Sequence, residues 1–145
     1  MARVSTYLNF PRSTEAAFMF YKSVFGTQFF MPIGRFKDIP VEPGQPPLAE
    51  ADKNLVMHVE LPILGGHMLM GTDAPESMGM TVKFGNNTYI NLEPDTRAET
   101  DRLFKALAVG GKVEEPLRDM FWGAYWGCVV DKFGVQWMLH CISKT

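Results

Sequence analysis

One histidine and one glutamate stand two positions apart in a segment whose polar and apolar residues alternate. The segment reads Met57-His58-Val59-Glu60-Leu61, and along a β-strand successive side chains point to opposite faces. His58 and Glu60 therefore share one face of the expected strand. A histidine with a carboxylate about 7 Å away along the strand could serve as a general base, directly or through a water. Alternatively, His58 is a structural residue whose ring bonds the hydroxyl of Tyr7 or Tyr89.

Aromatic side chains are densest in the segment Phe121-Trp122-Gly123-Ala124-Tyr125-Trp126. Trp126 could stack on a flat ligand, because an indole ring offers a large apolar face. The alternative is that the segment packs between two parts of the chain or between subunits. Cys128 shares a strand face with Trp126, but no base stands beside it, which argues against a nucleophilic thiol. The other cysteine is Cys141, and neither cysteine has C-x-x-C or metal-ligand spacing.

The elements that would position these residues occur twice. Tyr7-Leu8-Asn9-Phe10 returns 82 positions later as Tyr89-Ile90-Asn91-Leu92. Further matches follow in the same order and pair Glu15 with Glu99, Phe20 with Phe104, Gly26 with Gly110 and Gly66 with Gly134. This internal similarity indicates two modules, near residues 1–71 and 82–142, within a single domain 1–145. The first module has an extra segment, 36–54, which holds four of the ten prolines and is expected to be a long loop.

Each module shows the same order of expected elements. Helices are predicted at 14–25 and 97–109, where apolar residues follow a 3.6-residue period and a glycine stops the helix. Ser13 or Thr14 is expected to cap the first helix, and Thr96 with Glu99 to form the capping box of the second. Strands are expected at 7–10, 28–33, 55–61 and 67–70 in the first module, and at 89–92, 112–113, 125–130 and 135–141 in the second. The order is βαβββ, twice, which predicts an α+β fold.

A duplicated βαβββ unit resembles the vicinal oxygen chelate superfamily, which includes glyoxalase I, bleomycin resistance proteins and extradiol dioxygenases. The resemblance is closer to its PhnB-like branch and is carried by Tyr7–Phe10, Phe20-Tyr21, Val24–Gly26, Met57–Leu61, Trp126-Gly127 and, most specifically, Asp131-Lys132-Phe133-Gly134-Val135-Gln136-Trp137-Met138. It implies that the mixed sheets of the two modules curl into a cup that binds small molecules. Some members of this branch carry the label 3-demethylubiquinone 3-methyltransferase. The sequence gives that label no support, because it has no strand, glycine-rich loop and helix unit for a nucleotide-like methyl donor.

Strand alternation then assigns the residues expected to line the cup. His58 and Glu60 are the candidate catalytic residues, for proton transfer. The candidate ligand-binding residues are Tyr7, Asn9, Met70, Asn87, Tyr89, Asn91, Trp126, Cys128 and Met138. The apolar residues that alternate with them, such as Leu8 and Val59, are expected to lie beneath the helices.

The resemblance also bears on metal binding. Metal-using relatives place His, Gln or Glu at four cup positions, one on the first and one on the last strand of each module. The matching positions here are Ser5, Met70, Asn87 and Met138. None suits a divalent first-row metal, for which imidazole or carboxylate is the usual ligand. We expect no metal and no other cofactor.

Composition and net charge exclude some classes of binding partner. The chain has 145 residues, 46% of them hydrophobic, and a formal net charge of -2. This balance predicts a compact protein and offers no basic surface for nucleic acid or an anionic membrane. No segment reads as a signal peptide or a membrane span, so a cytoplasmic location is expected. A homodimer is expected, because such modules leave a sheet edge and a concave face to be covered.

Two functions remain open from the sequence. The first is a small-molecule enzyme that works without a metal, or with an unconventional one, and uses His58 and Glu60 for proton transfer. The second is a non-catalytic protein that sequesters a drug or metabolite in the cup, as bleomycin resistance proteins do. The polar residues expected in the cup favour a directional binding site over an inert surface. The residues alone do not name the ligand.

Overall fold

The chain forms two compact units, Met1–Val82 and Lys83–Thr145, in a computed structural model that describes residues 1–142 and 144–145. The first unit contains β1 (Thr6–Phe10), α1 (Thr14–Phe25), β2 (Gly34–Arg35), β3 (Val56–Pro62) and β4 (Met68–Asp73). The second contains β5 (Ile90–Leu92), α2 (Arg97–Ala108), β6 (Lys112–Asp119), β7 (Tyr125–Val130) and β8 (Gln136–Cys141). The order is βαβββ in each unit, so the predicted α+β fold class is confirmed.

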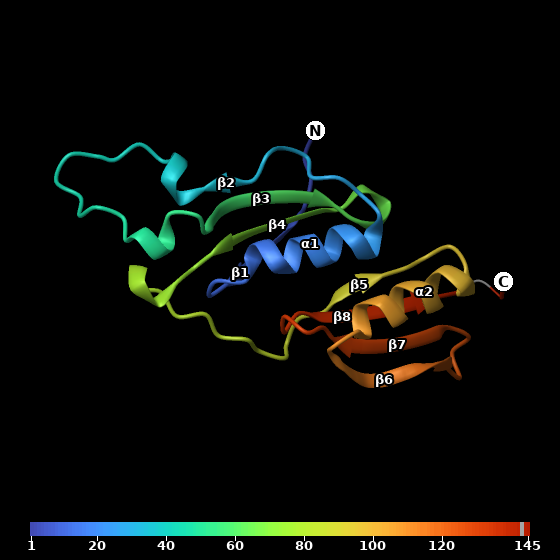
Figure 1. Ribbon diagram of the computed structural model, residues 1–145. Helices are drawn as coiled ribbons and strands as arrows, with labels where there is room; N and C mark the ends of the chain where they lie inside the picture. Colours follow the sequence, from blue (N-terminus) through green and yellow to red (C-terminus); the bar gives the residue numbers. More distant parts are fainter. Residues whose placement is uncertain (143) are drawn as a thin grey trace. The chain divides into compact units, whose positions relative to one another are not determined.

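Each unit builds one mixed four-stranded sheet. The strand orders are β1-β4-β3-β2 and β5-β8-β7-β6, in which only the pairs β1–β4 and β5–β8 are parallel. In each unit the helix lies along one face of its own sheet (Figure 1). The opposite face of each sheet carries the side chains that alternate with the helix-facing ones.

Two glycines show which face each helix covers. A Cβ atom on Gly71 of β4 would stand 2.6 Å from the ring of Phe18 in α1. A Cβ atom on Gly127 of β7 would stand 3.0 Å from the ring of Phe104 in α2. Both glycines therefore face their helix at close approach, which leaves no room for a side chain. The neighbours of each glycine along its strand point away from the helix.

The first helix is capped from the sheet rather than from its own sequence. The sequence predicted Ser13 or Thr14 as the cap, but the side chain of Ser13 makes no capping hydrogen bond to any described residue. Instead, Oδ1 of Asp73 accepts the backbone N–H of Thr14 at 3.0 Å, and Oδ2 accepts that of Val56 at 2.8 Å. In α2 the predicted cap is present, because Oγ1 of Thr96 accepts the N–H of Glu99.

The expected strand at 28–33 is wrong. The segment is irregular, and the second strand of the unit is only Gly34–Arg35. Pro32 lies in this segment and has no N–H to give to a ladder. A single backbone bond, from the N–H of Phe30 to the carbonyl of Glu60, holds it to β3. In the second unit the corresponding strand is longer than the expected 112–113 and continues to Asp119.

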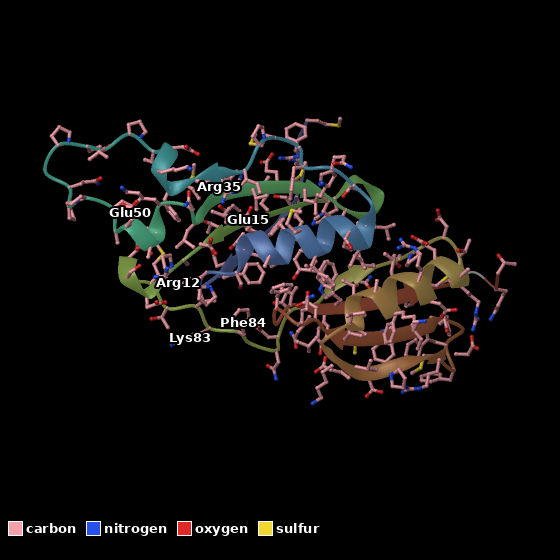
Figure 2. All side chains as sticks on the ribbon, viewed as in Figure 1. Arg12, Glu15, Arg35, Glu50, Lys83 and Phe84 are labelled. Carbon is pink, nitrogen blue, oxygen red and sulfur yellow. The ribbon has the colours of Figure 1, made fainter. Side chains whose placement is uncertain are left out.

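The long loop at 36–54 joins β2 to β3, as predicted. The structure describes all of it and places two short 3-10 turns there, Phe36–Asp38 and Glu50–Asp52, with no strand. Its start is held to the helix by Arg35, whose guanidinium bonds both carboxylate oxygens of Glu15 at 2.9 Å. Figure 2 shows these two side chains directed toward one another from β2 and α1. In the part of the chain that the structure describes, neither α1 nor α2 has the length and apolar content to cross a membrane.

Candidate functional site

Five of the predicted site residues, His58 among them, lie on the face of the first sheet that points away from α1. Because Gly71 faces α1, its neighbour Met70 faces the other way. Tyr7 is paired with Met70 across the β1–β4 ladder, and Glu60 is paired with Met70 across β3–β4. Asn9, two residues after Tyr7, has the same orientation.

His58 lies on this face between a tyrosine and a carboxylate. Its Nδ1 atom is 3.1 Å from the hydroxyl oxygen of Tyr7, and its Nε2 atom is 3.2 Å from Oε1 of Glu60. An ionised carboxylate can only accept a hydrogen bond, so in the neutral ring Nε2 carries the proton. Nδ1 then accepts the hydroxyl hydrogen of Tyr7. The three side chains form one chain of hydrogen bonds that starts at Tyr7 and ends at Glu60.

The exposed fraction of these side chains falls along the hydrogen-bonded path from Tyr7 to Glu60. Tyr7 is 49% exposed, whereas the side chain of His58 is 28% exposed and that of Glu60 is 11% exposed. Partial burial raises the pKa of the Tyr7 hydroxyl, a hydrogen bond with Thr72 opposes this, and the charge of Glu60 adds to the increase. Tyr7 therefore remains a neutral phenol near pH 7 and donates its hydrogen to His58.

Four of the predicted ligand-binding residues lie on the face of the second sheet that points away from α2. Gly127 faces α2, so Trp126 and Cys128 face away from it. Met138 is paired with Cys128 on one side and with Asn91 on the other, and all four side chains share this face. Cys128 is buried, and its burial, together with the nearby Glu114 and Glu115, raises the pKa of the thiol. A protonated thiol is a poor nucleophile.

Asn87 and Tyr89 precede β5 rather than forming part of it, because the strand begins at Ile90. Asn87 is exposed in a bend. The Tyr89 hydroxyl donates to Oε1 of Glu114 at 2.8 Å, and this hydrogen bond raises the pKa of Tyr89. In the described structure, therefore, the hydroxyl that meets His58 is that of Tyr7, and Tyr89 has a different partner. The roles of all these residues remain predictions.

The residues at the four metal positions of the superfamily do not fit a divalent first-row metal. The hydroxyl of Ser5 points to the sulfur of Met70 at 3.9 Å, a weak contact between two neutral groups. Asn87 and Met138 likewise offer an amide and a thioether. Across the residues described, no group of three or more His, Cys, Asp or Glu side chains is placed to hold an ion. We therefore derive no chemistry through a metal.

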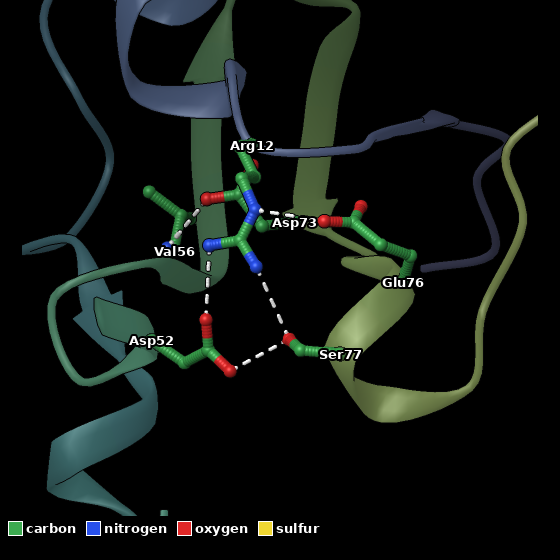
Figure 3. Close-up of polar contacts among 6 residues, drawn as sticks. All are labelled: Arg12, Asp52, Val56, Asp73, Glu76 and Ser77. Atoms are coloured by element: carbon green, nitrogen blue, oxygen red, sulfur yellow. Dashed lines mark hydrogen bonds and ion pairs between the residues drawn. The ribbon is translucent and has the colours of Figure 1, made fainter. Parts of the chain in front are cut away.

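A polar cluster at one end of the first unit was not found by sequence reasoning. Arg12 bonds Oδ1 of Asp52 at 2.9 Å and Oε1 of Glu76 at 3.3 Å, and Ser77 donates to Oδ2 of Asp52 at 2.7 Å (Figure 3). The cluster ties the end of the long loop to the turn before α1 and to the segment after β4. All of the guanidinium nitrogens of Arg12 are engaged. The members lie up to 65 residues apart, so no local pattern could have indicated them.

The two βαβββ units give the fold of the glyoxalase/bleomycin resistance/dioxygenase proteins. One such enzyme from Burkholderia phytofirmans has a TM-score of 0.62 at 19% identity, with 95% of this chain and 98% of that chain covered. The family model described as 3-demethylubiquinone-9 3-methyltransferase matches residues 2–140, and the chain belongs to this family, the PhnB-like branch of that superfamily.

Two solved structures are more similar. Protein PA1353 from Pseudomonas aeruginosa is 33% identical, with a TM-score of 0.81 and coverage of 97% of this chain and 98% of that chain. A PhnB protein from Bacillus cereus, called a putative 3-demethylubiquinone-9 3-methyltransferase, is 26% identical, with a TM-score of 0.75 and coverage of 97% and 99%.

The family name refers to a methyltransferase, and the two strand-to-helix turns can be compared with known sites for nucleotide-like cofactors. Dinucleotide and similar cofactors are held where a glycine-rich turn joins a strand to a helix in a mainly parallel sheet. The corresponding turns here read Pro11-Arg12-Ser13 and Glu93-Pro94-Asp95-Thr96, without glycine, and both sheets are mainly antiparallel.

Proposed function

We propose that the protein binds a small molecule against the face of the first sheet that carries His58, and that His58 exchanges a proton with it through the hydroxyl of Tyr7. One observation carries the proposal, namely the continuous path from Tyr7 through both ring nitrogens of His58 to Glu60. The exposed end of this path is a hydroxyl, and the buried end is a carboxylate. An acid–base site needs this order, because the ligand meets the hydroxyl and the carboxylate stabilises the charged ring.

The proton transfer needs no ionised form of Tyr7. A bound molecule gives a proton to the oxygen of Tyr7 while the hydroxyl hydrogen of Tyr7 moves to Nδ1 of His58. Tyr7 ends as a neutral phenol, and the ring becomes an imidazolium that donates Nε2–H to Glu60. The bound molecule is left as the conjugate base. The reverse sequence returns the proton.

The charge of the site bears on the class of ligand. With a neutral His58 ring, the nearly buried Glu60 carboxylate leaves one negative charge close to the site. While the His58 ring is neutral, the charge of Glu60 repels an anionic ligand. It does not repel a neutral carbonyl compound with an acidic C–H. We therefore expect a neutral ligand with a weakly acidic proton.

The second candidate function is binding without turnover. Both ring nitrogens of His58 are already hydrogen-bonded, and this arrangement also suits a rigid polar surface that only anchors a ligand through Tyr7. The two functions differ in one respect, because only the first moves a proton to or from carbon.

The experiment measures binding and proton exchange separately. Dihydroxyacetone is added to the full-length protein in D₂O, and deuterium entering the carbon next to the carbonyl is followed by NMR together with the Met70 methyl signal. We expect the wild-type protein to make deuterium exchange faster than it is in buffer. Tyr7→Phe and His58→Ala should abolish this acceleration. The matched control Tyr125→Phe, whose hydroxyl bonds Asp101 in the other unit, should keep it. A shifted Met70 signal without exchange would support the binding function. Neither effect in the wild-type protein would contradict both functions for this probe.

We also propose a homodimer and a cytoplasmic location. Phe121, at the turn between β6 and β7, is 97% exposed, and the adjacent Trp122 is 50% exposed. Such aromatic exposure is typical of surfaces that meet a second protein. Both cysteines are free and buried, which accords with a reducing compartment.

A further inference from the structure

A row of four side chains crosses the second sheet on the face that points away from α2. His140 of β8 is paired with Trp126 of β7, and Trp126 is paired with Arg118 of β6. Glu93 follows β5 and lies beside His140, with 3.5 Å between its Oε1 atom and Nδ1 of His140. Directly paired residues on neighbouring strands point to the same face. The row therefore presents a carboxylate, an imidazole, an indole and a guanidinium in that order.

Hydrogen-bonding groups remain free on both sides of the indole. Glu93 engages Nδ1 of His140, and Nε2 has no partner among the residues described. Arg118 uses Nη1 for Oε2 of Glu115 at 3.1 Å and for the carbonyl of Pro116, and its Nε and Nη2 atoms have no partner in the described chain. About half of the Arg118 side chain and a quarter of the His140 side chain are exposed. Both can therefore reach a molecule that lies on the sheet.

Trp126 supplies a flat apolar surface between these two polar groups. It is half-buried, and the ring of Trp122 stands 6.3 Å away, centroid to centroid, at 64° to it. Two rings at this angle form a corner rather than a stack. A planar ring laid on Trp126 would also meet Trp122 edge-on, which is a favoured aromatic geometry.

We propose that this row binds a planar aromatic carboxylate with a hydroxyl at the opposite end of its ring. The carboxylate accepts N–H groups of Arg118, the ring lies on Trp126, and the hydroxyl bonds Nε2 of His140. Arginine matches the planar geometry of a carboxylate. Arg118 and His140 lie two strands apart, about 10 Å at the backbone, which leaves room for one six-membered ring with a polar group at each end. The inference concerns a different sheet from the Tyr7–His58–Glu60 site and does not depend on it.

The test uses 4-hydroxybenzoate as the probe, titrated into the full-length protein by calorimetry and by NMR of the Trp126 indole N–H. We expect a shift of that signal and a loss of affinity of about tenfold or more in Arg118→Gln and in His140→Gln. The matched control is Arg102→Gln, an exposed arginine of α2 that pairs with Glu99. It is expected to change the affinity less than about twofold. Both test side chains are partly exposed, so the variants should fold, which their NMR spectra would verify.

Two related probes assign the contacts. Benzoate lacks the hydroxyl and should be insensitive to His140→Gln, whereas phenol lacks the carboxylate and should be insensitive to Arg118→Gln. The proposal is overturned if the wild-type protein does not bind 4-hydroxybenzoate below about 10 mM. It is also overturned if Arg102→Gln weakens binding as much as Arg118→Gln, or if binding survives both test substitutions.

Discussion

At His58, the two ring nitrogens meet different kinds of partner, and this difference sets the proton position. Glu60 can only accept and Tyr7 is a neutral donor, so we expect the neutral ring to carry its proton on Nε2. Long-range ¹H–¹⁵N NMR above pH 8 would measure this directly. In Glu60→Gln the amide can accept or donate, and a mixture of tautomers is expected. A wild-type ring protonated on Nδ1 would contradict the proposed path.

Two threonines with buried hydroxyls test how a single hydrogen bond changes the free energy of unfolding. Oγ1 of Thr14 is buried without a partner among the described residues, whereas Oγ1 of Thr100 donates to the carbonyl of Thr96 at 2.8 Å. Thr14→Val should raise the free energy of unfolding by about 1 kcal/mol, because it removes an unsatisfied polar group. Thr100→Val, the matched control, should lower it by about 1 kcal/mol. Urea unfolding at unchanged slope would measure both, and equal effects of the two changes would contradict this account.

Among the elements, α1 depends on β4 for its first hydrogen bond. Asp73 is buried and accepts N–H groups from the start of α1 and from β3, so it joins three elements. In Asp73→Asn one oxygen becomes an NH₂ group that faces an N–H donor, and we expect a loss of about 2–3 kcal/mol in urea unfolding. In Asp38→Asn the exposed side chain keeps one oxygen that can still accept the N–H of Arg35, so this change should cost less than about 1 kcal/mol. If both variants lost a similar free energy of unfolding, burial of the carboxylate would not determine the size of the loss.

The Arg12 cluster links the long loop to the rest of its unit, and its strength depends on pH. The hydrogen bond from Ser77 and the adjacent Arg12 lower the pKa of Asp52 below its usual value of 3.8. A lowered folded-state pKa means that the stabilisation is complete above the unfolded value and is lost as the pH falls through the folded value. We expect Asp52→Asn to reduce stability at pH 7 and to flatten the loss of stability below about pH 4. Parallel pH profiles of the wild type and the variant, measured by thermal unfolding, would contradict a role for this carboxylate.

For the whole molecule, the proposed homodimer predicts a mass of twice 16.3 kDa by light scattering at micromolar concentration. Phe121→Ser combined with Trp122→Ser removes the exposed aromatic pair of the β6–β7 turn. We expect this double variant to shift toward the monomer, because apolar area dominates the stability of most such contacts. A wild-type protein that remains a monomer would contradict the proposed assembly.

Local pattern was sufficient for the helices, most strands and the faces of the strands. The 3.6-residue period predicted α1 and α2 to within one residue, and alternation in β3 placed His58 and Glu60 opposite the buried Val59. These features depend on neighbours in the sequence, since helix and strand periods are properties of a few consecutive residues. The internal repeat then predicted the βαβββ order of both units.

Only the tertiary structure decided the contacts between distant segments. The hydroxyl that meets His58 is that of Tyr7, 51 residues away, and the cap of α1 is Asp73, 59 residues from Thr14. The segment 28–33 resembles a strand in composition but is joined to β3 by a single backbone hydrogen bond. Each of these outcomes depends on strand register and on the path of the connecting loops, which bring together residues whose local sequences contain no information about one another.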